Sequence, residues 1–179
     1  MMRMPGWRRF EVVSGEWRIC LACTRWIAGT AVLHLFRGIS RIGDGMVWYA
    51  LMFGIAALGG SQGRQAALHM ALVGILAATL YRLLKRWTRR PRPFRSHEGI
   101  VAHIAPLDEY SFPSGHTLHA VSFSLVAIAW YPSLLPVLLP LTLLIAISRV
   151  VLGLHYPSDV IVAMLIGTTL AEGSIAIML

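Results

Sequence analysis

Three short stretches of this 179-residue chain contain residue types that could act together on an anion. "KRWTRRPRP" begins at Lys85, "YSFPSGHTLH" begins at Tyr110 and "SRVVLGLHYPSD" begins at Ser148. Lysine and arginine bind phosphate oxygens, a histidine can transfer a proton or attack as a nucleophile, and a carboxylate can orient that histidine. Together these residue types favour chemistry on a phosphate group.

The first stretch offers a pair of cations for one anion. Arg92 presents a planar fork of donors and Lys85 a point charge, a combination that suits phosphate oxygens. Pro91 and Pro93 stiffen the chain around Arg92 and prevent a helix from continuing through it. The other basic residues near this pair are interpreted as a cationic collar at a lipid interface: Arg86, Arg89, Arg90 and Arg95.

The second stretch resembles the start of a helix that faces an anion. Ser114 suits the N-cap position, and Gly115 would let an anion approach the free N–H groups of the first turn. His116 would then lie at the rim of this cradle, where it could donate a proton. His119 is expected on the same helical face. Taken alone, an interfacial histidine is more often a hydrogen-bonded structural group.

The third stretch carries the most specific pattern. Arg149 ends an apolar run, where an unpaired charge would be costly, so it should meet an anion or a carboxylate. His155 precedes Asp159 by four residues, with Pro157 between them at the start of the next helix. The carboxylate could accept a hydrogen bond from one ring nitrogen and leave the other free as a nucleophile or base.

The composition indicates an integral membrane protein. Hydrophobic residues make up 56% of the chain, charged residues only 13%, and the mean hydropathy is +0.65. The net charge of +8 is typical of basic residues that flank membrane segments, and nucleic acid is not expected as a partner. Cys20 and Cys23 form a lone pair, interpreted as ordinary apolar residues. Residues 1–16 lack the apolar core of a cleavable signal peptide.

The elements that must position these side chains are membrane-spanning helices. Apolar runs predict five spans, at residues 42–60, 66–84, 117–131, 134–147 and 157–179. The segments "GSQG" and "YPS" are predicted turns after the first and third. Residues 1–41 form a basic N-terminal region, in which 17–37 is expected to be an amphipathic interfacial helix, with a sixth span as the alternative. The fold class is therefore an all-α membrane bundle in residues 42–179.

The order of the predicted spans brings the three stretches together. The first stretch closes the second span, the second opens the third, and the fourth span returns the chain to the third stretch. All three should meet at one membrane face, whatever the number of preceding spans. The long polar segment between the second and third spans lies at the same face, and a loop of this length is usually functional.

These positions resemble the three-part signature of the type 2 phosphatidic acid phosphatase (PAP2) superfamily. The matching residues are Lys85, Arg92, Pro93, Pro113, Ser114, Gly115, His116, Ser148, Arg149, His155 and Asp159. The resemblance implies that His155 attacks phosphorus and is phosphorylated, that Asp159 orients it, and that His116 protonates the leaving oxygen. It implies that the phosphoryl oxygens are held by Lys85, Arg92, Ser114, Gly115 and Arg149, without a metal or other cofactor.

The expected function is therefore that of a membrane lipid phosphatase acting on a phosphomonoester or diphosphate headgroup. Phosphatidate, phosphatidylglycerol phosphate, undecaprenyl diphosphate and lipid A phosphates all remain candidate substrates. The resemblance favours a multi-pass inner-membrane protein with an outward or periplasmic site. The oligomeric state stays open.

Three alternatives remain beside this interpretation. A lipid phosphotransferase could use the same histidine, and a lipid carrier or flippase would need only the basic pocket. A metal site could be built from residues close in sequence, although their spacing matches no common ligand pattern. These residues are His97, His103, Asp108, Glu109, His116 and His119.

Overall fold

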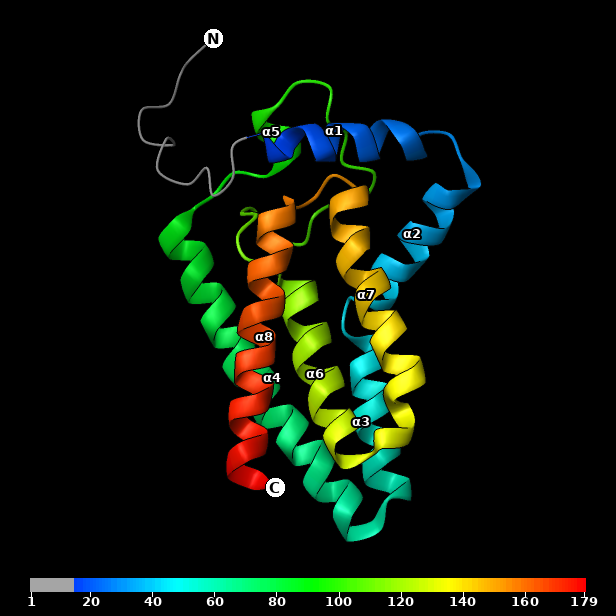
Figure 1. Ribbon diagram of the computed structural model, residues 1–179, viewed down its shortest axis with the longest axis vertical. Helices are drawn as coiled ribbons and strands as arrows, with labels where there is room; N and C mark the ends of the chain where they lie inside the picture. The colour runs from blue at the N-terminus through cyan, green and yellow to red at the C-terminus, as the bar shows by residue number, and fades with distance from the viewer. Residues whose placement is uncertain (1–14) are drawn as a thin grey trace.

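The computed structural model describes residues 15–179, and every regular element among them is a helix (Figure 1). The elements are α1 (Glu16–Ile27), α2 (Ala31–Ile42), α3 (Met46–Leu58), α4 (Gly60–Thr88), α5 (Pro93–Ser96), α6 (Gly115–Trp130), the 3₁₀ helix η2 (Pro132–Leu134), α7 (Leu135–Val151) and α8 (Pro157–Met178). This confirms the predicted all-α bundle. The first 14 residues of the predicted N-terminal region lie outside the described residues.

Three helical segments are long and apolar enough to cross a membrane. They are Gly60–Ser96, Pro132–Val151 and Pro157–Met178. The predicted spans at 42–60 and 117–131 correspond to the shorter helices α3, with 13 residues, and α6, with 16. α6 lies at the centre of the bundle and packs against α4, α7 and α8. The count of five spans stays a prediction.

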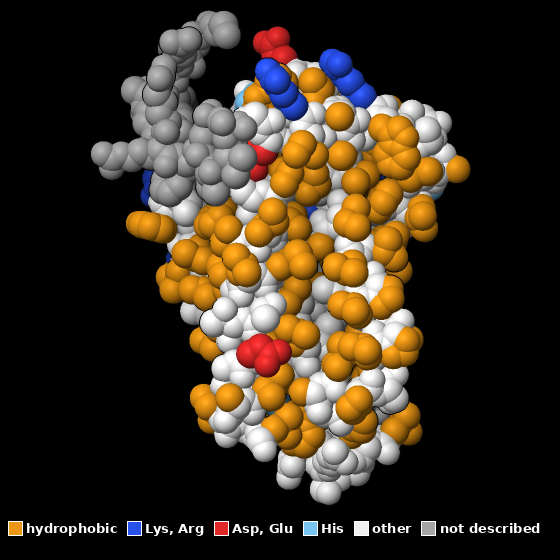
Figure 2. All heavy atoms as spheres, viewed as in Figure 1, with side chains coloured by type: hydrophobic (Ala, Val, Ile, Leu, Met, Phe, Trp, Pro, Cys, Tyr) orange, Lys and Arg blue, Asp and Glu red, His pale blue; other side chains and the backbone are white. Residues whose placement is uncertain are grey.

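The outer surface of the bundle is suited to lipid. Large side chains such as Phe53, Leu58 and Ile75 are 77%, 90% and 65% exposed. Figure 2 shows apolar side chains covering the helices of this face, with the basic side chains near the end that carries α1. A soluble protein rarely exposes so continuous an apolar surface, so the distribution agrees with a membrane protein.

The N-terminal region differs in part from the predicted single helix. α1 lies across one end of the bundle, as an interfacial helix would, and α2 bends away from it by 117° and leads into α3 (Figure 1). The break falls at Gly29, whose φ of 74° favours glycine, and at Thr30, the extended N-cap of α2. Residues 17–37 therefore contribute one helix across the bundle and the start of another along it.

The two predicted turns have different outcomes. "YPS" forms the junction of α6 with η2, as expected. "GSQG" is not a turn, because α4 already begins at Gly60 and the chain reverses at Gly59 and Gly60. The positive φ of 60° at Gly60 lets the chain reverse in fewer residues than the predicted four-residue turn.

Close packing of α6 against α8 fixes two of the three stretches. A Cβ atom at Gly167 of α8 would lie 3.0 Å from the backbone oxygen of Leu118, so glycine allows this close approach without a shift of the neighbouring helix. At the site end, the backbone N–H of Ser114 donates to the backbone oxygen of Asp159 at 3.2 Å. The beginnings of α6 and α8 are thus held side by side.

Candidate active site

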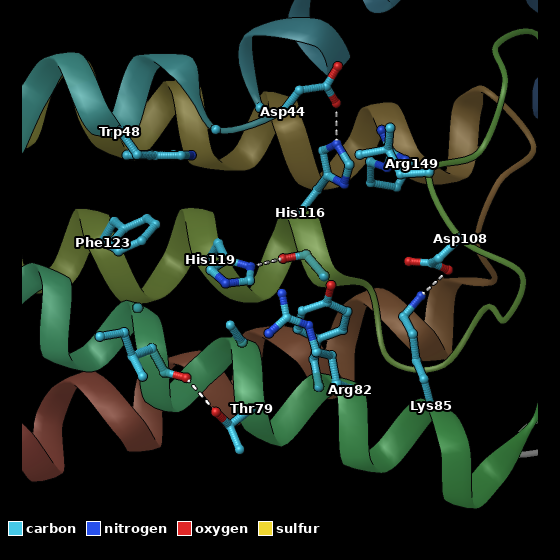
Figure 3. A pocket seen from close by; sticks show the side chains of 18 of the residues that line it. Asp44, Trp48, Thr79, Arg82, Lys85, Asp108, His116, His119, Phe123 and Arg149 are labelled. Atoms are coloured by element: carbon cyan, nitrogen blue, oxygen red, sulfur yellow. Dashed lines mark hydrogen bonds and ion pairs between the residues drawn. The ribbon is translucent and has the colours of Figure 1, made fainter.

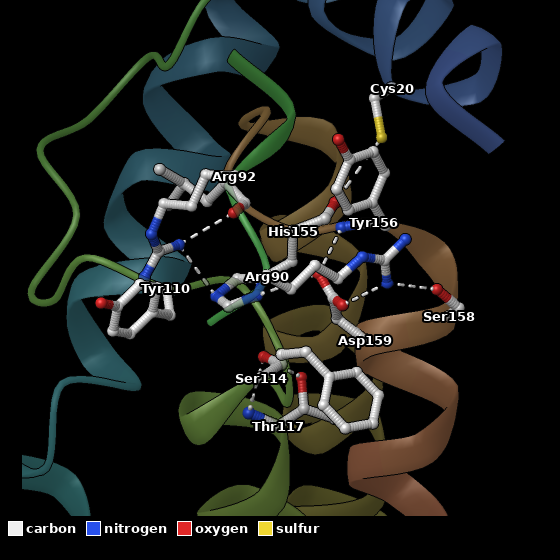
Figure 4. Close-up of polar contacts among 12 residues, drawn as sticks. Cys20, Arg90, Arg92, Tyr110, Ser114, Thr117, His155, Tyr156, Ser158 and Asp159 are labelled. Atoms are coloured by element: carbon white, nitrogen blue, oxygen red, sulfur yellow. Dashed lines mark hydrogen bonds and ion pairs between the residues drawn. The ribbon is translucent and has the colours of Figure 1, made fainter. Parts of the chain in front are cut away.

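The three stretches meet at the end of the bundle that α1 covers (Figures 3 and 4). A cavity of about 720 Å³ opens there. Six of the eight predicted site residues line it: Lys85, Arg92, Gly115, His116, Arg149 and His155. The other two, Ser114 and Asp159, are fully buried and do not line it. Residues more than 60 positions apart in the sequence therefore share one site, as the order of the predicted spans required.

His155 lies between a cation and a carboxylate. Nη1 of Arg92 donates to Nε2 of His155 at 3.1 Å, and Oδ2 of Asp159 lies 3.6 Å from Nδ1 of the ring (Figure 4). Because an arginine can only donate, Nε2 carries the lone pair and the ring proton is on Nδ1, facing the carboxylate. Nδ1 makes no hydrogen bond within the described chain, so Asp159 lies beside the ring without a hydrogen bond to it at this distance.

The surroundings of His155 keep its ring neutral. The residue is 1% exposed, and it lies in the loop between α7 and α8. Burial, followed by the positive charges of Arg92 and Arg149, lowers the pKa of His155 well below the ordinary value of 6.5. In a neutral imidazole the unprotonated nitrogen carries the lone pair that a nucleophile needs.

A carboxylate occupies the predicted phosphate cradle. Oδ1 of Asp108 accepts from Nζ of Lys85 at 2.6 Å and from Nη2 of Arg92 at 2.8 Å. Burial alone would raise the pKa of Asp108, but these two cations lower it below its usual value. One oxygen of Asp108 thus stands where a phosphate oxygen would be bound, and an incoming phosphate would compete with it for both cations.

Arg149 is the third cation of the cradle. It is 2% exposed, and Nη1 donates to the hydroxyl of Ser40 on α2. Its Nε is buried and has no hydrogen-bond partner in residues 15–179. A buried donor without a partner is costly, so the prediction that Arg149 meets an anion is supported by an unused donor beside the cavity.

His116 is oriented by a carboxylate that the sequence did not single out. Nε2 of His116 lies 2.5 Å from Oδ1 of Asp44, in the link between α2 and α3 (Figure 3). His119 also lines the cavity, but its Nδ1 lies 2.8 Å from the backbone oxygen of Gly115. Of these two imidazoles, only His116 has a carboxylate within residues 15–179 that could stabilise its protonated form.

Ser114 is the N-cap of α6, as predicted. Its Oγ accepts from the backbone N–H of Thr117 at 3.5 Å and lies 2.9 Å from the Thr117 hydroxyl. The hydroxyl is therefore turned into the helix start, away from the cavity, whereas Gly115 lines the cavity. The side chain of Ser114 shapes the cradle by fixing the first turn of the helix.

The interpretation of Arg90 as part of an exposed collar is wrong. Arg90 is 5% exposed, and its Nη1 donates to Oδ1 of Asp159 at 2.6 Å and to the hydroxyl of Ser158 at 2.8 Å (Figure 4). Its Nη2 donates to Glu16 of α1. Arg90 therefore links two buried carboxylates and holds Asp159 from behind His155. Arg86, Arg89 and Arg95 are exposed, as predicted.

α1 also touches the loop that carries His155. The buried thiol of Cys20 donates to the backbone oxygen of His155 at 3.6 Å, and Oε2 of Glu16 accepts from the backbone N–H of Ser158 at 3.1 Å. Cys20 lies in an apolar cluster with Ile100 and Tyr156, and both cysteines are free, which supports their interpretation as apolar residues. α1 thus supports the loop that carries His155.

The residues considered as metal ligands serve other purposes. Within residues 15–179, no three side chains of His, Cys, Asp or Glu gather as a ligand group. His103 is hydrogen-bonded to the backbone oxygen of Thr24 at 3.1 Å, and His97 to the hydroxyl of Tyr156 at 3.3 Å. The metal alternative gains no support from these positions.

The cavity continues from the charged end toward the apolar part of the bundle. Its lining includes Trp48 of α3, Ile75 of α4 and Phe123 of α6. Figure 3 shows Trp48 and Phe123 on one side of the view, with Lys85, Asp108 and Arg149 on the other. Gly74 lets the Phe123 ring pack closely against α4, because a Cβ atom there would lie 2.6 Å from that ring. A polar end joined to an apolar extension suits a molecule with an anionic head and a hydrocarbon tail.

The fold and the site together define a class: a helical membrane protein with a His–Asp pair beside a cradle of buried cations. A model of the PAP2 superfamily matches residues 66–178, and the chain belongs to this superfamily. It is therefore a phosphatase of the PAP2 type, an enzyme that hydrolyses phosphate esters.

Individual relatives agree with this assignment. A decaprenylphosphoryl-5-phosphoribose phosphatase of Mycobacterium tuberculosis is 30% identical over 138 residues, which cover 77% of this chain and 76% of the relative. Undecaprenyl-diphosphatase BcrC of Bacillus subtilis is 33% identical over 129 residues, or 68% of this chain and 65% of the relative. A transmembrane PAP2-type phosphatidylglycerolphosphate phosphatase from Bacillus subtilis shares the fold with a TM-score of 0.75 at 24% identity, over 92% of this chain and 84% of that structure.

Proposed function

We propose that this protein releases phosphate from a lipid headgroup through a phosphohistidine formed on Nε2 of His155. The observation that carries the proposal is the placement of His155, whose Nε2 accepts from Arg92 at the cavity while Asp159 lies behind Nδ1. Attack by this nitrogen needs a phosphate held in line, a proton for the leaving oxygen and compensation of negative charge. The surrounding residues can supply all three.

The first half-reaction transfers the phosphoryl group to the protein. The Nε2 lone pair forms a bond to phosphorus as the bond from phosphorus to the lipid oxygen breaks. The leaving oxygen takes a proton from His116, whose protonated form Asp44 stabilises. Asp159 faces the positive charge that develops on the imidazole ring. Lys85, Arg92 and Arg149 compensate the charge on the phosphoryl oxygens, after the phosphate has displaced Asp108.

The second half-reaction returns His155 to its starting state. His116, now unprotonated, accepts a proton from water as the water oxygen attacks phosphorus. The bond from phosphorus to Nε2 breaks, and inorganic phosphate leaves with the proton balance restored. Backbone N–H groups at the start of α6, near Ser114 and Gly115, would add donors to the phosphoryl oxygens.

A lipid substrate is favoured by the shape of the cavity. Its apolar extension along α3, α4 and α6 would hold the tail, while the headgroup lies at the charged end. A panel of phosphatidate, phosphatidylglycerol phosphate, undecaprenyl diphosphate and lipid A, assayed for phosphate release by purified protein, would test the proposal. Release from none of them would contradict it.

The side of the membrane that the site faces stays a prediction. The resemblance favours the outward or periplasmic side. The exposed arginines Arg18, Arg86 and Arg89 lie at the end of the bundle that holds the site. The positive-inside rule associates an excess of basic residues with the cytoplasmic side. Labelling of a single cysteine introduced at Glu109, with impermeant reagent on intact cells, would decide between the two orientations.

We expect orthovanadate to inhibit and EDTA to leave activity intact. Vanadate can adopt the five-coordinate geometry of a transferring phosphoryl group, and Lys85, Arg92 and Arg149 would bind its oxygens. Phosphate release is measured with increasing vanadate, and separately after EDTA treatment. Activity lost in EDTA and restored by zinc or magnesium would contradict a mechanism built on protein side chains alone.

We expect the effect of His116→Ala to depend on the leaving group. An alkoxide leaves poorly without a proton, so the rate on a lipid phosphomonoester should fall by roughly 10²- to 10⁴-fold. An aryl phosphate such as p-nitrophenyl phosphate releases a stable anion, so its rate should fall much less. The matched variant His119→Ala should lower neither rate strongly. Equal losses on both substrates would assign His116 to binding or structure instead.

A further inference from the structure

A second cavity, of about 300 Å³, adjoins the first. Arg37 and Arg41 of α2 line it, together with His103 of the long loop. The two cavities share Asp44, Leu107 and Arg149 in their linings. A group bound in the second cavity would therefore be a direct neighbour of a phosphate held near His155.

The second cavity carries a clear excess of positive charge. Three arginines line it against one carboxylate, and that carboxylate, Asp44, already holds His116. Arg37 and Arg41 are four residues apart on α2, a spacing at which like charges repel. Within residues 15–179 neither forms an ion pair, and the one hydrogen bond of Arg37 goes from Nε to the backbone oxygen of His103 at 3.0 Å.

Arg149 connects this cavity to the cradle. Arg149 is 2% exposed, and its Nε has no hydrogen-bond partner in the described chain. An anion in the second cavity could accept from Arg149 together with the guanidinium groups of Arg37 and Arg41. Guanidinium groups bind phosphate oxygens well because their planar donors match the oxygens in pairs.

We propose that the second cavity is a second anion site, which binds another phosphate group of the same lipid whose terminal phosphate lies at His155. This inference rests on the lipid phosphatase function proposed above and narrows its substrate class. The preferred substrate would carry two phosphates in its headgroup, as a diphosphate or as a phosphomonoester beside a phosphodiester. A lipid with a single phosphomonoester would leave the second anion site unfilled.

The test compares two substrates in the variant Arg41→Gln. Arg41 is exposed and its side chain makes no hydrogen bond or ion pair with residues 15–179, so its replacement should not disturb the fold. Phosphatidylglycerol phosphate and phosphatidate with the same acyl chains are assayed in uncharged detergent micelles. The same comparison is made with undecaprenyl diphosphate and undecaprenyl phosphate. Arg18→Gln, which removes an exposed arginine of α1, is the matched control.

We expect the ratio of kcat/KM for the two-phosphate lipid to that for the one-phosphate lipid to fall roughly tenfold in Arg41→Gln, through KM. The ratio should keep its wild-type value in Arg18→Gln. An unchanged ratio in Arg41→Gln, or equal falls in both variants, would overturn the second anion site. Wild-type protein inactive on all four lipids and on lipid A would instead overturn the proposed function, and with it this site.

A further arm distinguishes the substrate's own phosphate from that of a neighbouring lipid. Phosphatidylglycerol is added to the micelles while phosphatidate turnover is measured. If a neighbouring lipid filled the second anion site, added phosphatidylglycerol would change the rate of phosphatidate turnover in the wild type but not in Arg41→Gln. That result would overturn the proposal that the second phosphate belongs to the same lipid. An equal effect of phosphatidylglycerol on the turnover rates of both proteins would support the same-lipid proposal.

Discussion

Replacement of His155 by alanine is expected to abolish turnover, with a fall in kcat of about 10⁴-fold or more. In residues 15–179, the other two histidines that line the cavity are placed differently: His116 is held by Asp44 and His119 by the backbone of α6. The rate is measured as phosphate release from the most active lipid of the panel.

Two variants serve as controls for this loss. His34→Ala removes an exposed histidine of α2 and should keep the wild-type rate. Asp159→Asn should keep a small residual rate, because Asp159 orients the ring and does not attack. Elution as a single species and an unchanged Tm would show that His155→Ala is folded. A near wild-type rate in that variant would exclude His155 as the nucleophile.

Among alanine substitutions of the arginines in "KRWTRRPRP", Arg90→Ala is expected to lower the free energy of unfolding most. Arg90 is the shared partner of Glu16 and Asp159, which are 5% and 0% exposed. Its removal would leave two buried carboxylates without a cation, a change that typically costs about 3–5 kcal/mol. The free energy of unfolding, or the Tm in detergent, should fall accordingly. Turnover should fall too, because Asp159 would lose the group that fixes it behind His155.

The neighbouring Arg89 provides the matched control. It is exposed, and within residues 15–179 its side chain donates only to the backbone oxygen of Arg86 in α4, so Arg89→Ala should change Tm little. Adding Glu16→Gln to Arg90→Ala should restore part of the stability, since one of the two unpaired charges is then removed. Equal losses of stability in Arg89→Ala and Arg90→Ala would show that the buried network is not stabilising.

The bundle itself could be predicted because its causes are local. Runs of apolar residues specify α4, α7 and α8, and the proline and serine at helix starts specify where α6 and α8 begin. The break between α1 and α2 was not foreseen. It depends on a positive φ at Gly29, which the sequence permits but does not require. The same holds for Gly60, where the reversal is tighter than the predicted turn.

The candidate site could be predicted where residues follow fixed spacings, as with Lys85 and Arg92 or His155 and Asp159. The supporting carboxylates could not, since each acts across long sequence distances. Glu16 meets Arg90 74 positions away, and Asp44 meets His116 72 positions away. In the sequence Arg90 could not be told apart from its exposed neighbours, because its burial depends on contacts with α1, which is distant in the sequence. One usable signal was present: Asp44 stands between two glycines, at the entry to an apolar run.

The most direct test of the mechanism is to trap the phosphorylated protein. A lipid labelled with ³²P in its terminal phosphate is mixed with enzyme and quenched in alkali within the first turnover. We expect label on the wild-type protein that is stable in alkali and lost in acid, as for a phosphorus–nitrogen bond. None should appear on His155→Ala. Rapid phosphate release by the wild type without any trapped label, or label of the same kind on His155→Ala, would contradict a phosphohistidine at His155.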